Sequence, residues 1–359
     1  MATRAERKRV LVFPGDDASP EAVIPSVRLL ESMNLPLEFQ FPKLDLAELK
    51  QGILPSTTKT AIDQADAVLF GAASSTALPI LFYLRWGLET YANVRPVRFI
   101  PGTKSPLRNP ERIDYVIVRE NLEGLYPGRE GDLSLLRERL PEITDQAGQK
   151  LRDVSDGKFA IRVITEKRTR RLAEFAVELA LERKRQGYEG RISCFTKSNM
   201  LRQSDGLFQA VTESVVQRHS ALKYDHFIVD DGARRLVQSP EQFDVIITSN
   251  LYGDILSDVG AATIGGLGLA PSGCYGEQKA YFEPVHGTAP DLAGKHIINP
   301  TATLLSAAMM LTHLHLQGEA LNLEKAVRAV YQAGNVLPVD QWGKVSTEEF
   351  LRAVRDHLG

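Results

Sequence analysis

The sequence predicts an α/β protein, and three observations support this class. Short apolar runs with the length of buried strands alternate along the chain with longer segments of helical period. The 359 residues are enough for one large or two medium domains with a full hydrophobic core. The hydrophobic fraction of 43% and the charged fraction of 25% are typical of a soluble globular protein.

The composition also limits where the protein works and what it binds. The net charge of -2 gives no general attraction to nucleic acid or to an anionic membrane, so neither is an expected partner. No stretch has the apolar length of a membrane span, and residues 1–13 lack the apolar core of a signal peptide. Because only two cysteines occur, Cys194 and Cys274, we expect structural thiols and a cytoplasmic protein without disulfide bonds.

Strands and helices are expected in regular succession. Pro20 and Pro300 suit the first turn of a helix, and Met309 and Met310 are better explained by a buried core or an oligomer contact than by a cofactor site. We expect strands at residues 10–13, 67–71, 115–119, 192–195, 226–229 and 243–248. We expect helices at residues 20–33, 79–91, 166–186 and 300–316, and one that begins near residue 250.

The segment 127–160 fits neither pattern. It is polar, highly charged and interrupted by glycines. We interpret it as an extension from the core: an arm, a mobile loop or a partner contact.

Two carboxylates four residues apart are the most informative feature of the chain. Asp254 and Asp258 follow the predicted strand 243–248 within an expected helix, so they share one helical face. Like charges on one face repel, and Mg²⁺ or Mn²⁺ would hold them because these ions favour carboxylate oxygens. Asp230, after the strand-like run 226–229, is a candidate third ligand. A solvated helix face is the simpler alternative for the pair taken alone.

Three arginines and two further polar residues are candidates for substrate binding and catalysis. Arg85, Arg95 and Arg119 flank the middle elements, and guanidinium groups bind carboxylates through paired hydrogen bonds. Lys197 follows a strand and could act as a base or proton relay near a metal, and Tyr126 suits a general acid toward a developing enolate. Each of these residues taken alone would more often be structural.

The loop at residues 283–299 suits a nucleotide, although it contains neither G-x-G-x-x-G nor a Walker motif. Asp291 could accept both hydroxyls of an adenosine ribose, and its charge would repel a 2′-phosphate, which favours NAD over NADP. A structural loop is the equally weighted alternative.

Taken together, these segments resemble the β-decarboxylating hydroxyacid dehydrogenases, which include isocitrate, 3-isopropylmalate, homoisocitrate and D-malate/tartrate dehydrogenases. The motifs occur in the family's order at Leu84-Arg85, residues 91–96, 118–126 and 196–199, Val229-Asp230, and residues 250–258 and 283–291. The resemblance implies an isopropylmalate dehydrogenase-like fold, with two α/β domains and a large mixed sheet of ten to twelve strands, which is not a Rossmann fold.

The resemblance also implies a domain organisation and an assembly. Residues 1–100 and 260–359 would form a cofactor-binding domain from both chain ends. Residues 101–259 would form a substrate and dimerisation domain that carries the arm at 127–160. Two residues, Lys197 and Asp230, would reach the active site from the partner chain of a homodimer.

Site roles follow from the same motifs. The resemblance implies Arg85, Arg95 and Arg119 for the malate carboxylates, Tyr126 and Lys197 for catalysis, and Asp230, Asp254 and Asp258 for Mg²⁺ or Mn²⁺. It implies Asn199, Glu283, His286, Gly287, Thr288, Ala289, Asp291 and Asn299 for NAD. In the implied mechanism, metal and lysine promote loss of the hydroxyl proton while hydride passes to NAD⁺; the β-keto acid then loses CO₂, and the tyrosine protonates the enolate carbon.

Leu81 and Phe82 bear on the substrate, because positions one turn before the first arginine read the substrate's variable group in this family. An apolar pair argues against a third carboxylate and so against isocitrate. The runs 95–98 and 196–199 look most like the tartrate/D-malate branch, so we expect a D-malate-type substrate such as D-malate or tartrate. We place 3-isopropylmalate second, and homoisocitrate or isocitrate third.

Departures from the family pattern indicate an unusual subgroup. The run Asp17-Ala18-Ser19 lacks two family glycines, and Asp tolerates positive φ better than most residues. Arg234 replaces a usual methionine, and it could pair with Asp230, reach a substrate anion or lie on the surface. A regulatory subunit without catalysis and a small-acid binding protein are alternatives of other classes, but the retained catalytic and cofactor motifs argue against both.

Overall fold

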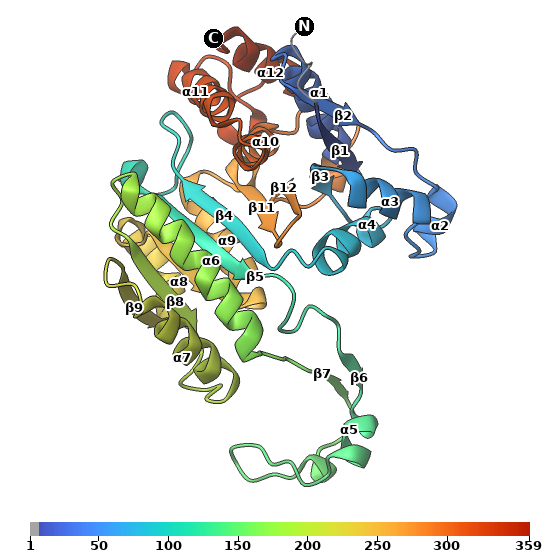
Figure 1. Ribbon diagram of the computed structural model, residues 1–359, viewed down its shortest axis with the longest axis vertical. Helices are drawn as coiled ribbons and strands as arrows, with labels where there is room; N and C mark the ends of the chain where they lie inside the picture. The colour runs from blue at the N-terminus through green and yellow to red at the C-terminus, as the bar shows by residue number, and fades with distance from the viewer. Residues whose placement is uncertain (1–6) are drawn as a thin grey trace, which may run out of the picture.

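The fold is organised around a 10-stranded mixed sheet (Figure 1). The computed structural model describes residues 7–359. Of the stretch 1–13, which lacks a signal-peptide pattern, residues 1–6 therefore lie outside the described part. The strand order is β2-β1-β3-β12-β11-β4-β5-β10-β8-β9. The strands of this sheet are β1 (Lys8–Gly15), β2 (Leu37–Gln40), β3 (Ala67–Ala72), β4 (Ala92–Arg98), β5 (Asp114–Glu120), β8 (Arg191–Thr196), β9 (Lys223–Ile228), β10 (Val245–Thr248), β11 (Pro271–Tyr275) and β12 (Ala280–Pro284). The predicted α/β class with a large mixed sheet is confirmed.

Helices cover both faces of the sheet. On the β5-β10-β8 half, α6 and α7 pack on one face, and α8 and α9 lie on the other. The helices are α1 (Ser19–Ser32), α2 (Leu46–Lys50), α3 (Ser56–Gln64), α4 (Leu78–Phe82), α5 (Leu133–Arg139), α6 (Glu166–Arg185), α7 (Ser204–Val216), α8 (Val229–Gln238), α9 (Asn250–Ile264), α10 (Thr301–His313), α11 (Gln317–Ala333) and α12 (Thr347–Asp356). Within residues 7–359, no helix is both long and apolar enough to cross a membrane.

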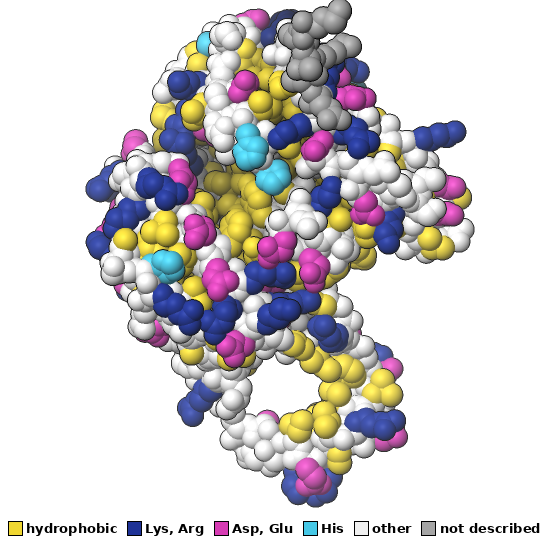
Figure 2. Space-filling model, in the orientation of Figure 1, with side chains coloured by type: hydrophobic (Ala, Val, Ile, Leu, Met, Phe, Trp, Pro, Cys, Tyr) yellow, Lys and Arg dark blue, Asp and Glu magenta, His cyan; other side chains and the backbone are white. Residues whose placement is uncertain are grey.

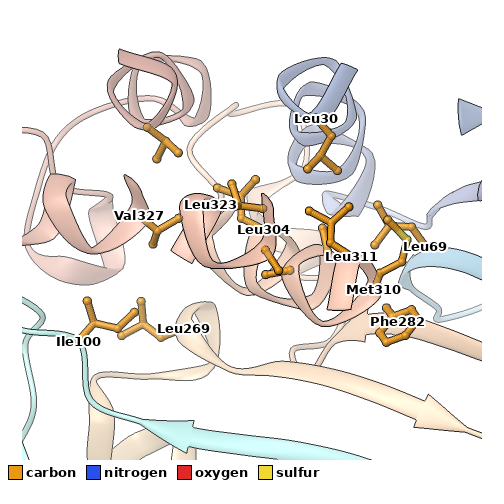
Figure 3. Close-up of a cluster of buried hydrophobic side chains, with 14 of the residues drawn as sticks. Leu30, Leu69, Ile100, Leu269, Phe282, Leu304, Met310, Leu311, Leu323 and Val327 are labelled. Atoms are coloured by element: carbon orange, nitrogen blue, oxygen red, sulfur yellow. The ribbon is translucent and has the colours of Figure 1, made fainter. Parts of the chain in front are cut away.

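Alternation along β1 shows how the sheet is buried on both sides. Val10 and Val12 belong to the core under α1, α10 and α11, whereas Leu11 and Phe13 belong to the core under α3 and α4. Figure 3 shows the first of these cores, where Met310 lies near Leu69 and Phe282, and Leu323 lies near Leu304. Met310 is fully buried, which agrees with the core role expected for it.

Two expected helices are shorter than predicted. The helix expected at 79–91 ends at Gly87, because α4 passes into a single π-helical turn, Tyr83–Gly87, and Glu89 then adopts a left-handed φ of 51°. The helix expected at 300–316 spans Thr301–His313. Residues 92–98, which directly follow the first of these segments, form the polar strand β4.

The segment 127–160 extends away from the rest of the molecule at the bottom of Figure 1. It contains α5 and a small two-stranded sheet, β6 (Glu130–Asp132) with β7 (Lys158–Ala160). Leu135, Leu140 and Ile143 are about half exposed on it, and Figure 2 shows apolar side chains gathered there. Exposed apolar residues on an extension are typical of a surface that another chain covers.

Candidate active site

Three of the predicted side chains meet at a fourth, Asp254, in the second turn of α9. Arg95 Nη1 lies 3.1 Å from Asp254 Oδ1, and Arg119 Nη1 forms an ion pair with the same oxygen. Tyr126 donates its phenolic hydrogen to Asp254 Oδ2. These residues come together because β4 and β5 pair antiparallel and α9 packs across both strands.

The two arginines are held by polar residues that the sequence analysis did not single out. Asn250 Oδ1 accepts hydrogen bonds from Arg119 Nε at 3.1 Å and Nη2 at 2.8 Å. Arg95 donates to Ser257 Oγ at 2.5 Å and to Asn93 Oδ1 at 3.2 Å. Asn250 and Ser257 are within one or two turns of Asp254 on α9, so their spacing was a visible signal. Asn93 lies two residues before Arg95 on the same face of β4, a spacing that the sequence also shows.

Close packing explains a glycine within the aspartate motif. A Cβ on Gly253 would lie 2.6 Å from Arg119 Cγ, so any other residue would displace the arginine. Gly253 therefore leaves the space on α9 that the side chain of Arg119 occupies.

Buried groups of both charges meet in this centre. Burial, with Arg95 as a like charge, lowers the pKa of Arg119 to about 9. Burial favours a neutral Asp254, but Arg119 and Arg95 outweigh it and lower the pKa of that carboxyl. Burial would also lower the pKa of Arg85, yet Tyr281 and Glu283 raise it. Three guanidinium groups thus share one neighbourhood with the carboxyl groups of Asp254, Asp258 and Glu283. Guanidinium groups gathered in this way suit an acid with more than one carboxylate.

Asp258 lies one turn beyond Asp254 on the same face, as predicted. Burial raises its pKa, Arg95 opposes that effect, and the charge of Asp254 adds to it. Within residues 7–359, Asp258 has no hydrogen-bond or ion-pair partner, so its oxygens are available. Asp258 therefore offers free oxygen atoms, whereas both oxygens of Asp254 already accept hydrogen bonds from Arg95, Arg119 and Tyr126. Two neighbouring carboxylates are ligands that a hard divalent cation prefers.

The third predicted metal ligand lies apart from this pair. Asp230, in the first turn of α8, has a side chain that is 68% exposed and forms an ion pair with Lys197 Nζ. The hydrogen bond from Lys197 lowers the pKa of Asp230. Among the described residues, no group of three His, Cys, Asp or Glu side chains could hold a metal ion. A single chain therefore separates the candidate residues into an Asp254–Asp258 group and a Lys197–Asp230 group.

The candidate cofactor loop borders a cavity of about 450 Å³, separate from the arginine site. Its lining includes His286, Gly287, Ala289 and Asn299 from the predicted set, together with the turn at 265–268 and Asp340, which the sequence analysis missed. The glycines of that turn, Gly265-Gly266-Leu267-Gly268, were a readable signal of close backbone approach.

Polar atoms in this cavity suit a nucleotide. His286 Nε2 is buried and has no partner in the described part of the chain, while its Nδ1 lies 2.9 Å from Gly287 O. Asn299 Nδ2 already donates to Asp340 at 3.1 Å and to the Tyr331 hydroxyl. The volume and the free ring nitrogen fit an adenosine-sized group.

The remaining predicted cofactor residues are placed differently. Glu283 is buried at the end of β12, and Asp291 is exposed in the short turn that follows Ala289. Thr288 is buried and accepts a hydrogen bond from Ala18 N at 3.1 Å. Asn199 is exposed beside Lys197 after β8, and no hydrogen bond in residues 7–359 connects it with the loop.

The departures near β1 are accommodated by local hydrogen bonds. Asp17 adopts a φ of 53°, a conformation that Asp tolerates, and its carboxylate accepts from Ser74 Oγ at 3.0 Å. Ser19 Oγ accepts from Ala72 N at 2.9 Å. Arg234 pairs with Asp231 and Gln238, so of the three roles considered for it the structure supports the surface one.

Phe82 and Trp86 place apolar surface beside Arg85, whereas Leu81 is partly buried and packs against the core under α3 and α4. Phe82 is 48% exposed, and its ring lies 5.3 Å from that of Trp86, which also packs beside the Arg85 guanidinium at 5.6 Å. Trp86 Nε1 donates to Leu122 O at 3.2 Å and so connects this helix to the loop that carries Tyr126.

Comparisons with known proteins agree on one group of relatives, the isocitrate and isopropylmalate dehydrogenases. The family description of isocitrate/isopropylmalate dehydrogenases matches residues 9–354. The chain is 42% identical to the 3-isopropylmalate/3-methylmalate dehydrogenase of Methanocaldococcus jannaschii, over 97% of this chain and 99% of that protein. It is 40% identical to the 3-isopropylmalate dehydrogenase of Archaeoglobus fulgidus, over 98% and 99%. The crystal structure of isocitrate dehydrogenase from Methylococcus capsulatus superposes with a TM-score of 0.84 at 30% identity, covering 98% of this chain and 99% of that one.

Proposed function

The chain belongs to the isocitrate/isopropylmalate dehydrogenase family, and from this premise we propose that it oxidises and decarboxylates a 3-alkylmalate such as 3-isopropylmalate. It has the isocitrate dehydrogenase-like α/β fold and is a decarboxylating hydroxyacid dehydrogenase. The expected tartrate/D-malate branch finds no support among these relatives, whereas the second candidate, 3-isopropylmalate, matches their names.

The observation that carries the proposal is the convergence of Arg95, Arg119 and Tyr126 on Asp254, together with the apolar wall that Phe82 and Trp86 form beside Arg85. The arginines suit the two carboxylates of a malate, and the apolar wall suits an alkyl group at C3. A third carboxylate would be desolvated against Phe82, which disfavours isocitrate.

The chain's own residues have distinct tasks in this reaction. Arg85, Arg95 and Arg119 hold and orient the carboxylates, and Asn250 and Ser257 fix the arginines.

Tyr126 is positioned to deliver a proton to the carbon that loses CO₂. Burial and its hydrogen bond to Asp254 raise the pKa of Tyr126, so the phenol keeps its proton until a strong base such as an enolate forms. Lys197 relays the proton of the substrate hydroxyl.

Two bound groups complete the proposed chemistry. Asp254 and Asp258, with Asp230 of the partner subunit, would hold a Mg²⁺ or Mn²⁺ ion, which would supply a Lewis acid; the cavity at His286 would hold NAD, which would supply the hydride acceptor. Asp291 favours NAD over NADP because its charge opposes a 2′-phosphate.

We further propose a homodimer with shared sites and with the domain division 1–100 plus 260–359 and 101–259. The separation of Lys197 and Asp230 from Asp254 within one chain supports the sharing, and the exposed apolar residues of the arm support a partner contact. Mixing Lys197→Met with Tyr126→Phe protein tests this. Half of the dimers are mixed and each has one intact site, so about a quarter of the wild-type activity returns. If Lys197 serves its own chain, the mixture stays inactive.

Substrate choice is tested by steady-state kinetics with NAD⁺ and Mn²⁺ on 3-isopropylmalate, D-malate, tartrate, homoisocitrate and isocitrate. Burial of the three extra carbons of the isopropyl group favours 3-isopropylmalate over D-malate by about 50-fold in kcat/KM. Phe82→Ser is expected to reduce this preference. Phe41→Ser serves as the matched control, because Phe41 is exposed to the same extent but lies outside the proposed site. Equal kcat/KM for 3-isopropylmalate and D-malate would contradict the proposal.

A further inference from the structure

A cavity of about 200 Å³ lies on the opposite face of the sheet from the arginine cluster. Successive residues of β4 point to opposite faces, so Arg95 reaches α9 whereas its neighbours Pro96 and Arg98 line this cavity. The other walls come from β5, the end of α6, β11, α10 and α11. Figure 2 shows the surface hollowed between the C-terminal helices and the half of the molecule that carries α6.

The floor of the cavity is apolar. Ile100, Leu269, Leu305 and Met309 contribute to it from three different segments, the last two from α10. Figure 3 shows Ile100 and Leu269 side by side below Val327 of α11. A floor of this kind desolvates whatever lies on it, so it favours an aliphatic group over a hydrated ion.

The rim of the cavity is charged, and most of its charges are already paired. Asp114 binds Arg98 Nε at 2.9 Å and Arg183 Nη2 at 3.2 Å, and it accepts a hydrogen bond from the Tyr188 hydroxyl at 2.9 Å. Glu324 makes only a long contact of 3.8 Å with Arg98. Arg183 Nε also forms an ion pair with Asp244 Oδ1 at 2.5 Å. Of the three arginines that line the cavity, Arg98 and Arg183 are therefore paired, which leaves one without an ion-pair partner among residues 7–359.

Arg328 of α11 is that residue. It is partly buried, and within residues 7–359 its guanidinium group has no ion-pair or hydrogen-bond partner. Burial, followed by the like charge of Arg98, lowers the pKa of Arg328. The cavity thus combines an unpaired cation on one wall with an apolar floor on another.

We propose that this cavity binds a short aliphatic monocarboxylate, whose carboxylate pairs with Arg328 and whose alkyl tail lies on the floor formed by Leu305 and Met309. One carboxylate supplies the ion-pair partner that Arg328 lacks, and the other two arginines of the lining are already paired, so a second negative charge would find no free cation there. The cavity holds only a small molecule, and a branched tail of four or five carbons covers its floor. The proposal does not depend on the substrate assigned to the active site.

Calorimetric titration of the full-length protein with 4-methylpentanoate tests the proposal. We expect saturable binding on the order of a millimolar, as suits a ligand of eight non-hydrogen atoms. Acetate, which lacks the tail, is expected to bind at least tenfold more weakly in the same experiment. This comparison needs no variant, so a folding defect cannot imitate it.

Variants locate the binding. Arg328→Met keeps the aliphatic stem and is expected to weaken binding at least tenfold, because a charge-assisted pair is lost. Lys325→Met, which removes an exposed charge from the same helix, and Arg85→Met, in the arginine cluster, are expected to bind like the wild type. Absence of saturable binding, equal binding of acetate, or undiminished binding by Arg328→Met would each overturn the proposal. Loss of binding in Arg85→Met would assign the titration to the active site and overturn it as well.

Discussion

Replacing Glu120 with glutamine is expected to change how the stability of the protein depends on pH. Glu120 ends β5, directly after Arg119, and its side chain is 1% exposed. Its Oε1 accepts hydrogen bonds from the backbone of Leu122 at 2.7 Å and Glu123 at 3.2 Å. Its Oε2 is buried and has no partner in the described residues, so only one oxygen of the carboxyl group is hydrogen-bonded.

The size of the expected change in unfolding free energy follows from the buried environment of Glu120. Burial, with the charge of Glu123 as a further contribution, raises the pKa of Glu120 from 4.5 to about 7. Between about pH 4.5 and pH 7, Glu120 therefore keeps its proton in the folded protein but has lost it in the unfolded chain. The resulting stability is fully present below about pH 4.5 and is lost as pH rises through about 7, at a cost of about 3 kcal/mol in the free energy of unfolding.

Urea denaturation of wild-type and Glu120→Gln protein at about pH 4.5, 6, 7 and 8 measures this effect. Glutamine keeps the acceptor for both backbone N–H groups but does not titrate, so the wild type should lose about 3 kcal/mol relative to the variant across this range. Glu178→Gln, at an exposed position on α6, is the matched control and should follow the wild type. Parallel pH curves for wild-type and Glu120→Gln protein would refute the reasoning.

Further substitutions test the site. Ser257→Ala removes one acceptor from Arg95 while Asp254 remains, so KM for the hydroxyacid should rise about tenfold with little change in kcat; a fall in kcat alone would contradict this role. Tyr126→Phe should lower kcat by about 100-fold or more and leave NAD affinity, measured by fluorescence titration, unchanged. Asp291→Ala should reduce the ratio of kcat/KM for NAD over NADP by about tenfold, and an unchanged ratio would remove Asp291 from cofactor selection.

Several parts of the fold could be predicted because they depend on local sequence. The apolar runs at 10–13 and 67–71 could only be buried strands, and the long α6 was found within one residue of its end. Asp254 and Asp258 could be placed on one face because helical spacing alone determines that relation.

Other parts depend on contacts between distant segments. The strand β4 alternates polar and apolar residues, and its sequence shows no apolar run because Arg95 points toward α9 rather than into a core. Strands β11 and β12 were missed for a similar reason: they are short, and pairing with β4 and β3 stabilises them.

The candidate site divides in the same way. Its charged residues were identifiable by type and order, but the uncharged side chains that hold them were not. Asn250 of α9 accepts from Arg119 of β5, and this partnership appears only when the two elements are assembled. Asn93 lies two residues before Arg95 on the same strand, so its role could be read only once β4 was recognised as a strand. The same limit applies to Arg328, whose lack of a partner is a property of the cavity and not of its sequence neighbours.

The most direct test of the central claim is the stoichiometry of the reaction with 3-isopropylmalate. Wild-type protein with NAD⁺ and Mn²⁺ should form one NADH and one CO₂ for each 3-isopropylmalate consumed, with 4-methyl-2-oxopentanoate as the organic product. EDTA and the Tyr126→Phe substitution should both suppress this conversion. Folded protein that binds NAD but forms neither NADH nor CO₂ from 3-isopropylmalate, while it turns over another hydroxyacid, would contradict the account.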